Sequence, residues 1–278
     1  MEFESVLASN YALPDLVKLL NRGFEDYFIP IHFNPDMFSN MLRKDGIDLA
    51  DSRVLVVDDQ ACGIALIARR RGLRASRVAA MGIAKETRGK GAGSWFIKKL
   101  IADARKRGDR EMALEVIEQN EPAVKLYRKY GFECMRRLVG YIHTDRGTAK
   151  IESRELDRID LREMGGLISQ YGLADLPWQL SGESVTQISP PPYAYRHGPA
   201  YIVISNPEAE HVVIWSLLVE PQARGKGLGT QMLQRVLAHH EGKTWHVPAI
   251  FPEELGNVFE RAGFEKEKLS QWQMKLEL

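Results

Sequence analysis

Residues 88–94 read RGKGAGS, and residues 224–230 read RGKGLGT, an offset of 136 positions. The pair Gly131-Phe132 recurs as Gly263-Phe264, at an offset of 132. Self-similarity at an offset of about half the 278-residue chain indicates two copies of one structural unit. We predict domains at residues 1–146 and 147–278, joined within the polar stretch Thr144–Lys150.

Hydrophobic periodicity predicts the same order of elements in both copies. In the first copy the expected elements are helices Leu16–Phe24 and Pro35–Arg43, strands Arg53–Asp58, Cys62–Arg69 and Arg77–Ala84, a helix from the glycine-rich stretch to Arg107, strand Met112–Ile117, a short helix after Asn120 and strand Glu133–Tyr141. In the second copy, strands are expected near Ala200–Ser205 and His211–Val219. The pattern predicts an α+β, or mixed α/β, fold given twice.

The glycine-rich stretches suit phosphate binding. Each follows a predicted strand and opens a predicted helix, so glycine N–H groups and the positive helix end would meet an anion together. Two other phosphate loops are excluded by spacing: the residue after Gly-Lys is Gly rather than Ser or Thr, and GxGxxG is not matched. The alternative is a tight turn without a ligand.

Both stretches resemble the acetyl-CoA-binding signature of the GNAT (GCN5-related N-acetyltransferase) superfamily, Gln/Arg-x-x-Gly-x-Gly/Ala. The resemblance implies two tandem GNAT folds, each a central, mixed, mostly antiparallel sheet flanked by helices, with acetyl-CoA as cofactor. The coenzyme-binding residues that it implies in the first copy are Met81, Gly82, Ile83, Arg88, Gly89, Lys90, Gly91, Ala92, Gly93 and Ser94. In the second copy they are Leu217, Leu218, Val219, Arg224, Gly225, Lys226, Gly227, Leu228, Gly229 and Thr230.

A further stretch, LEV at 114–116, NEPAVKLY at 120–127 and GF at 131–132, resembles GNAT enzymes such as the ribosomal-protein N-terminal-alanine acetyltransferases. By this resemblance Tyr127 protonates the departing CoA thiolate, Glu115 accepts the amine proton and Asn120 contacts the coenzyme. An amine attacks a thioester only when neutral, and each such proton transfer typically contributes about 10²–10⁴-fold in rate. The alternatives are core packing for Tyr127, a solvated strand face for Glu115 and a plain helix cap for Asn120.

The second copy lacks these side chains. At an offset of 132, Phe259 replaces the tyrosine, Val247 the glutamate and Pro252 the asparagine, while the neighbouring His246 should face the other way. We therefore predict that the second copy binds a coenzyme, shapes the acceptor cleft or stabilises the pair without catalysing. Since some tandem members of the family are active in their second copy, activity there stays an alternative.

Composition adds few constraints. The 38 Lys and Arg residues nearly balance the 37 Asp and Glu, so a strong electrostatic attraction to nucleic acid or membrane is not expected. The amino terminus shows no signal peptide, and the apolar run Val212–Val219 is too short to span a bilayer. Cys62 and Cys134 form no pairing motif, and the scattered histidines indicate no metal site. An intracellular, cytoplasmic protein is predicted.

The predicted activity is transfer of an acetyl group from acetyl-CoA to a primary amine by direct attack in a ternary complex, because no Cys or Ser is placed for a covalent intermediate. The acceptor is a small molecule or a peptide, and the two copies would pair as an internal pseudo-dimer. One alternative is a non-catalytic CoA-binding sensor or scaffold. Another is an RNA-associated module acting through Arg69–Arg71 and Arg74, for which a solvated turn is the simpler interpretation.

Overall fold

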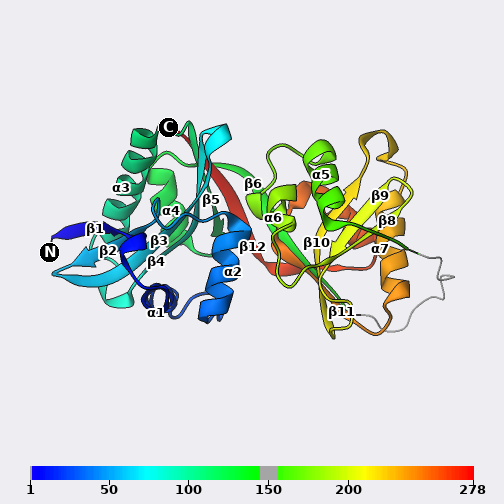
Figure 1. Ribbon diagram of the computed structural model, residues 1–278, viewed down its shortest axis with the longest axis horizontal. Helices are drawn as coiled ribbons and strands as arrows, with labels where there is room; N and C mark the ends of the chain where they lie inside the picture. Colours follow the sequence, from blue (N-terminus) through cyan, green and yellow to red (C-terminus); the bar gives the residue numbers. More distant parts are fainter. Residues whose placement is uncertain (1, 145–155) are drawn as a thin grey trace. The chain divides into compact units, whose positions relative to one another are not determined.

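The structure, a computed structural model, describes residues 2–144 and 156–278 (Figure 1). The chain forms two compact units: unit 1 is Met1–Met135 with Trp272–Leu278, and unit 2 is Arg136–Gln271. The predicted boundary between residues 146 and 147, and all of the predicted joint except Thr144, lie outside the described residues.

Unit 1 is an α+β fold with a mostly antiparallel sheet, as predicted. Its elements are β1 (Phe3–Leu7), α1 (Leu13–Gly23), α2 (Pro35–Asp45), β2 (Arg53–Val57), β3 (Gln60–Arg70), β4 (Ala75–Ile83), α3 (Ala92–Arg107), β5 (Glu111–Ile117) and α4 (Glu121–Lys129). The strand order is β1-β2-β3-β4-β5-β12, and β4 and β5 run parallel. The pairs β1–β2, β2–β3 and β3–β4 are antiparallel.

The helix ends in unit 1 follow local sequence signals. The Asn34 side chain caps α2 by accepting a hydrogen bond from the Met37 N–H, and Gly46 ends it in the left-handed region at φ +65°. Gly108 ends α3 in the same way, at φ +75°, as the sequence predicts.

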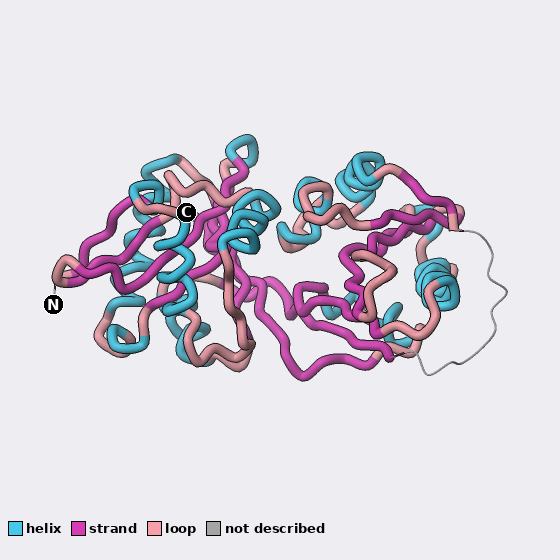
Figure 2. The backbone as a smooth tube through the Cα atoms, turned by 60° about the horizontal axis from the view of Figure 1, so that its bottom comes forward, coloured by secondary structure: helices cyan, strands magenta, loops and turns pink. Residues whose placement is uncertain are grey.

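Helices cover both faces of the unit 1 sheet (Figure 2). On one face, α3 and α4 bury Phe96, Leu100 and Tyr127 against strand residues such as Leu55 and Met112. On the other face, α1 and α2 bury Leu16, Leu20 and Phe38 against Val54 and Leu66. This second face matters below because Glu115 points toward it.

Unit 2 repeats the architecture. Its elements are β6 (Glu133–Thr144), β7 (Asp157–Ile159), α5 (Leu161–Tyr171), α6 (Gly182–Val185), β8 (Tyr193–His197), β9 (Ala200–Ile204), β10 (His211–Val219), α7 (Leu228–His239), β11 (Thr244–Pro252), α8 (Asn257–Arg261) and the first part of β12 (Glu265–Glu277). The strand order is β12-β6-β11-β10-β9-β8-β7, with β10 and β11 parallel.

The two compact units do not follow the sequence repeat at their last strands. From Arg136 onward, β6 belongs to unit 2, where it pairs antiparallel with β11 from Thr144↔Thr244 to Leu138↔Pro252. From Trp272 onward, β12 belongs to unit 1, where the Leu278 N–H donates to the Arg110 carbonyl. Each copy's last strand therefore completes the sheet of the other copy's unit.

Candidate functional site

In unit 1 the strands β4 and β5 part at a β-bulge. Their parallel pairing runs from Ala75↔Glu111 to Val78↔Leu114. At the next residue, Ala79, the register with β3 shifts, since Ile67 faces Val78 and Leu66 faces Ala80. Among the described residues no strand pairs with the β5-facing edge of β4 beyond this bulge, which leaves backbone N–H and C=O groups available to an extended ligand.

The predicted coenzyme strand lies in this unpaired part of β4. Met81 and Ile83 pack against the core cluster that contains Tyr127, whereas Gly82 faces α1. A Cβ built on Gly82 would lie 3.0 Å from the Gly23 Cα, and one built on Gly23 would lie 2.8 Å from the Gly82 Cα. Both glycines are therefore required for the direct backbone contact between α1 and β4.

The predicted phosphate turn directly follows β4. Gly89 and Gly91 are in the left-handed region, at φ +75° and +87°, and Gly91 is the N-cap of α3. No side chain of the described chain caps this helix, and its backbone ladder begins with the Trp95 N–H bonding to the Gly91 carbonyl. The N–H groups of Ala92, Gly93 and Ser94 are thus the free donors of a helix amino terminus, and Gly89, Lys90 and Gly91 are exposed.

Arg88 holds the turn in place through its side chain. Its Nε donates to the Ile83 carbonyl at 2.8 Å, and its Nη2 donates to the Gly23 carbonyl at 3.0 Å. The guanidinium therefore ties the end of β4 to the end of α1. The Arg88 side chain, which was predicted to bind the coenzyme, therefore positions the backbone around the turn, and its place in the motif did not reveal this role.

Tyr127 lies on α4, on the buried face of that helix. Its ring meets Phe132 edge-on, with centroids 5.7 Å apart, and its side chain is only 7% exposed. Burial raises the pKa of the Tyr127 phenol well above its ordinary value, and the nearby Tyr27 phenol adds to the shift. The phenol is therefore protonated at neutral pH, as a proton donor must be.

Asn120 is both a helix cap and a partner of a second phenol. Its Oδ1 accepts a hydrogen bond from the Ala123 N–H at 3.3 Å, at the start of α4. Its side chain also hydrogen-bonds Tyr27, which lowers the pKa of that phenol, while burial, the larger effect, raises it. Tyr27 lies between α1 and α2, in a segment that also contains Phe24, Phe28 and Phe33, and the sequence alone gave it no catalytic or binding role.

Glu115 lies apart from Tyr127, on the face of the sheet that α1 and α2 cover. Arg77 of β4 donates to its Oε2 from Nε and from Nη2, both at 2.7 Å, and each side chain is only 4% exposed. The alternative of a solvated strand face is therefore wrong. The sequence analysis assigned no role to Arg77. The available signal was that an arginine and a glutamate lie on two neighbouring predicted strands, where they could form an ion pair.

Unit 2 reproduces the bulge and the turn. The parallel pairing of β10 with β11 ends at Val213↔His246, and the register with β9 shifts at Trp215, the counterpart of Ala79. Gly225 and Gly227 both have φ +77°, and Gly227 begins α7, which no side chain of the described residues caps. Arg224 donates to the Val219 carbonyl at 3.0 Å and to the Tyr171 carbonyl, as Arg88 does to the matching atoms of unit 1.

The side chains predicted for catalysis have no counterparts in unit 2. Phe259 meets Phe264 edge-on at 5.6 Å, the same packing that Tyr127 makes with Phe132. The counterpart of Glu115 differs by one residue from the predicted Val247 when the strand registers are used. Ala75 pairs with Glu111 in unit 1, and its counterpart His211 pairs with Thr244 in unit 2. Pro248, rather than Val247, therefore stands at the position of Glu115.

The neighbouring side chains agree with this correction. Val247 faces the core like Leu114. His246 points away from Val247, as predicted, but in the corrected register this is the face on which Glu115 lies in unit 1, and its Nε2 is 3.1 Å from Glu267. Gly256 is the residue directly before α8, and the Tyr141 hydroxyl occupies the space that a Cβ there would need.

A cavity of about 370 Å³ opens in unit 2 at the counterpart of the unit 1 site. Its walls include the predicted coenzyme strand, Leu217–Val219, and most of the predicted turn, Arg224 to Thr230. The remaining walls come from α5 and the segment after it, from Phe251 of β11 and from α8. The second copy therefore has a preformed binding space next to a turn suited to phosphate.

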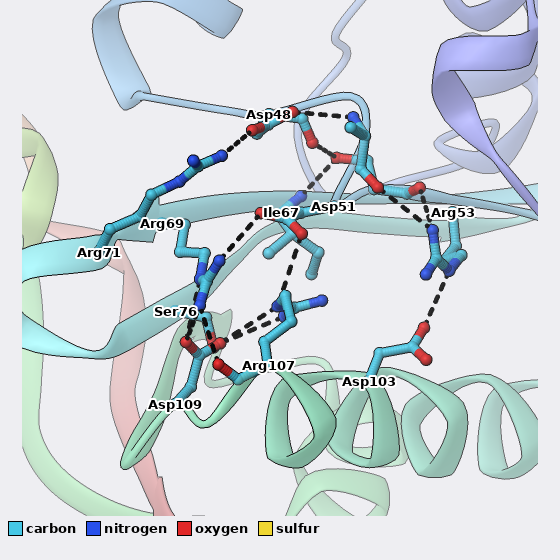
Figure 3. Close-up of polar contacts among 12 residues, drawn as sticks. Asp48, Asp51, Arg53, Ile67, Arg69, Arg71, Ser76, Asp103, Arg107 and Asp109 are labelled. Carbon is cyan, nitrogen blue, oxygen red and sulfur yellow. Dashed lines mark hydrogen bonds and ion pairs between the residues drawn. The ribbon is translucent and has the colours of Figure 1, made fainter.

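The arginines of the β3–β4 connection are bonded within unit 1 (Figure 3). Arg69 is 2.9 Å from the fully buried carboxylate of Asp109, which Arg107 also contacts at 3.3 Å. Arg71 pairs with Asp48 at 3.1 Å. Arg69 is thus a partly buried structural cation, with 17% of its side chain exposed, rather than part of a solvated turn, whereas Arg71 is largely exposed.

Within the described part of the chain, residues 2–144 and 156–278, no helix has the length and apolar character needed to cross a bilayer. Nor do three or more His, Cys, Asp or Glu side chains gather there in a way that could hold a metal ion.

Each of the two copies matches a known protein family. Residues 13–132 match the acetyltransferase (GNAT) family, and residues 194–266 match an acetyltransferase (GNAT) domain. No curated protein sequence matches the chain. The resemblance of the first copy to ribosomal-protein N-terminal-alanine acetyltransferases stays a prediction.

Solved structures share the fold over nearly the whole chain. A GCN5-related N-acetyltransferase from Sphaerobacter thermophilus has a TM-score of 0.69 at 16% identity, with 99% of this chain and 95% of that chain covered. A tandem GNAT protein from the clavulanic acid biosynthesis pathway has a TM-score of 0.67 at 18% identity, with 99% and 98% covered. A putative acetyltransferase from Pyrococcus horikoshii has a TM-score of 0.66 at 12% identity, with 99% and 89% covered. With its two matched domains, the chain belongs to the GNAT acetyltransferase family, as a tandem member.

Proposed function

We propose that unit 1 transfers an acetyl group from acetyl-CoA to a primary amine, in a single step within a ternary complex. The observation that carries the proposal is the buried, protonated Tyr127 phenol of α4, in the core cluster against which Met81 and Ile83 of the bulged strand β4 pack. Unit 2 has the same bulge and turn but Phe259 in place of this phenol. Only the first copy therefore offers a proton donor at this position.

The residues of unit 1 fit acetyl-CoA at three points. The N–H groups from Gly89 to Ser94 would bind its diphosphate, and the β5-facing edge of Met81–Ile83 would pair with the amides of its pantetheine arm. A backbone N–H beside the Ala79 bulge would stabilise negative charge on the acetyl oxygen. Acetyl-CoA supplies the activated acetyl group as a thioester.

In the proposed reaction Tyr127 donates its proton to the sulfur as the C–S bond breaks. The neutral amine nitrogen forms the new C–N bond, releases one proton to water, and Tyr127 regains a proton from solvent. Amine and acetyl-CoA are thereby converted to amide and free CoA.

Glu115 is less well placed to accept the amine proton. Protonating it would remove the hydrogen-bonded counter-charge of Arg77 and leave only the Asp45 carboxylate nearby, which is costly in a site where the Arg77 and Glu115 side chains are 4% exposed. In the proposal Glu115 and Arg77 therefore position β4 and β5 relative to each other, and the amine proton leaves through water.

Turnover by the full chain tests the proposal. Acetyl-CoA is incubated with peptides, polyamines, amino sugars and aminoglycosides, and both the released thiol and the acetylated product are measured. For Tyr127→Phe we expect kcat to fall by about 10²–10⁴-fold, because the thiolate loses its proton donor. The matched control, Tyr130→Phe at the C-cap of the same helix, should stay within about twofold of the parent, because Tyr130 lies outside the proposed proton path.

Two outcomes would contradict the proposal. Undiminished turnover by folded Tyr127→Phe would place the chemistry in the second copy, whose cavity already favours binding there. Binding of acetyl-CoA without transfer to any amine in the panel would instead favour a CoA-binding sensor or scaffold.

A further inference from the structure

The unit 2 cavity has two chemically different ends. One end is the turn around Gly225 and Gly227, where the uncapped α7 presents N–H donors and Arg261 adds positive charge at the rim. The other end is apolar and is formed by Ile168, Leu173, Leu176, Leu180 and Trp215. Leu173 is 38% exposed, which places part of this apolar wall at the cavity mouth.

A difference between the copies explains why this apolar space is open in unit 2. In unit 1, Gly23 of α1 and Gly82 of β4 are in direct backbone contact. Arg88 donates to the Gly23 carbonyl and Arg224 to the Tyr171 carbonyl, so Tyr171 is the counterpart of Gly23. The offset of 136 positions between the glycine-rich stretches makes Leu218 the counterpart of Gly82. A side chain at the Gly82 position would overlap the helix backbone, so α5 cannot approach β10 as closely as α1 approaches β4.

The unit 2 counterparts of Tyr127 and Glu115 carry no group for acyl transfer. Phe259 has no proton to donate, Pro248 has none to accept, and the Trp215 indole stands at the bulge where unit 1 has Ala79. A thioester bound here would meet apolar side chains at the place where an acceptor amine would otherwise approach. The geometry therefore suits retention of a ligand rather than its reaction.

We propose that unit 2 binds and retains an acyl-CoA whose apolar acyl chain is longer than acetyl. The proposal rests on the proposed function in one respect, the use of the glycine-rich turns for the coenzyme diphosphate. The acyl chain lies between Leu173, Leu176, Leu180 and Trp215, and the diphosphate lies on the N–H groups that follow Gly227. Unit 1, closed at the Gly23–Gly82 contact, takes the acetyl ester.

Calorimetric titration of the full chain with CoA, acetyl-CoA, octanoyl-CoA and free octanoate tests the proposal. Octanoyl-CoA has six more methylene-equivalent carbons than acetyl-CoA, and each fully buried methylene strengthens binding about fourfold. We expect octanoyl-CoA to bind unit 2 at least about tenfold more tightly than acetyl-CoA does, which requires burial of only about two methylenes. Mixed with amines, the bound octanoyl ester should persist.

Two variants assign the binding to unit 2. Leu173→Glu at the cavity mouth should abolish the octanoyl preference and leave acetyl-CoA binding unchanged, because it places a charge in the apolar end only. Gly225→Ala with Gly227→Ala should weaken every CoA ester at this site, since both glycines have positive φ. The matched pair Gly89→Ala with Gly91→Ala should leave octanoyl-CoA binding intact. Thermal unfolding verifies that each variant folds.

The proposal is overturned by equal affinity for acetyl- and octanoyl-CoA, by loss of octanoyl-CoA binding in the Gly89/Gly91 variant only, or by octanoyl transfer to an amine. Free octanoate binding as tightly as its CoA ester would also overturn it, in favour of a fatty-acid site. Failure of the proposed function is seen separately, in the acetyl turnover of Tyr127→Phe, and leaves the octanoyl titration unaffected.

Discussion

Among single residues, Tyr127 and Phe259 give the sharpest comparison between the two copies. Each ring meets the phenylalanine of its Gly-Phe pair edge-on, at centroid distances of 5.7 and 5.6 Å. The shared packing shows that an aromatic ring at this position belongs to the core of both units. The hydroxyl of Tyr127 is the part that packing does not require, so it is the part that we assign to catalysis.

The Arg77–Glu115 pair calls for a test that separates positioning from proton transfer. Removing one partner leaves a buried charge, which we expect to destabilise unit 1 by about 3–5 kcal/mol. Replacing both, as Arg77→Met with Glu115→Leu, should restore most of that stability because both charges of the pair are removed together. Denaturant unfolding measures both effects.

Turnover by the same double variant decides the role of Glu115. In the positioning account, acetyl transfer stays within about tenfold of the parent, because no proton-accepting group has been lost. A folded double variant with a loss of 100-fold or more at neutral pH, relieved as the pH rises and the amine loses its own proton, would restore Glu115 as the base.

At the scale of elements, the strand–bulge–turn–helix segment is the unit that both copies share. The bulge residues Ala79 and Trp215 are separated by the same 136 positions as the glycine-rich stretches. Each segment has a 3₁₀ turn before its arginine, two left-handed glycines and a helix that no side chain caps within the described residues. This agreement indicates that the segment was kept as a whole, although the second copy lacks the tyrosine.

The turn of the first copy should control coenzyme binding during turnover. We expect Gly89→Ala with Gly91→Ala to raise the KM for acetyl-CoA by at least about tenfold, because positive φ strains any residue with a Cβ by about 1–3 kcal/mol. The matched Gly225→Ala and Gly227→Ala pair should leave that KM within about twofold. Initial-rate kinetics with saturating amine measure it. The reverse pattern would assign the reacting coenzyme to unit 2.

Part of this segment could be predicted from sequence. The glycine spacing fixed the turn and the start of α3, and Gly108 fixed its end. The arginine of the motif was predicted to bind coenzyme, but its side chain holds the ends of β4 and α1 together. Local spacing could not reveal this, because Arg88 and Gly23 are 65 residues apart and meet only in the folded unit.

At the scale of the whole molecule, the chain divides differently in sequence and in structure. The repeat indicates copies at residues 1–146 and 147–278, but each compact unit contains most or part of the last strand of the other copy. Periodicity predicted the first of these strands, at Glu133–Tyr141, and assigned no residues to the second. The partner of neither strand could be predicted, because either sheet offers an open position next to a parallel pair. The apolar side chains of β12, such as Met274 and Leu276, suit the core of unit 1.

This exchange makes the carboxyl-terminal strand essential to the first unit. Met274 is fully buried in the core that contains Tyr127, so we expect Met274→Ala to destabilise unit 1 by about 2–5 kcal/mol and to lower acetyl transfer at elevated temperature. Lys275→Ala on the same strand should change stability by less than about 1 kcal/mol, because its ion pairs are partly exposed. Thermal unfolding compares them, and equal effects would mean that β12 does not complete unit 1.

A crystal structure of the full chain with acetyl-CoA and a slow-reacting amine analogue tests the central claim most directly, because it shows which phenol lies next to the sulfur. The account predicts the diphosphate on the N–H groups from Gly89 to Ser94 and the coenzyme sulfur within hydrogen-bond distance of the Tyr127 hydroxyl. Acetyl-CoA bound in unit 2 alone, with the unit 1 turn empty and Tyr127 remote from any thioester, would contradict it.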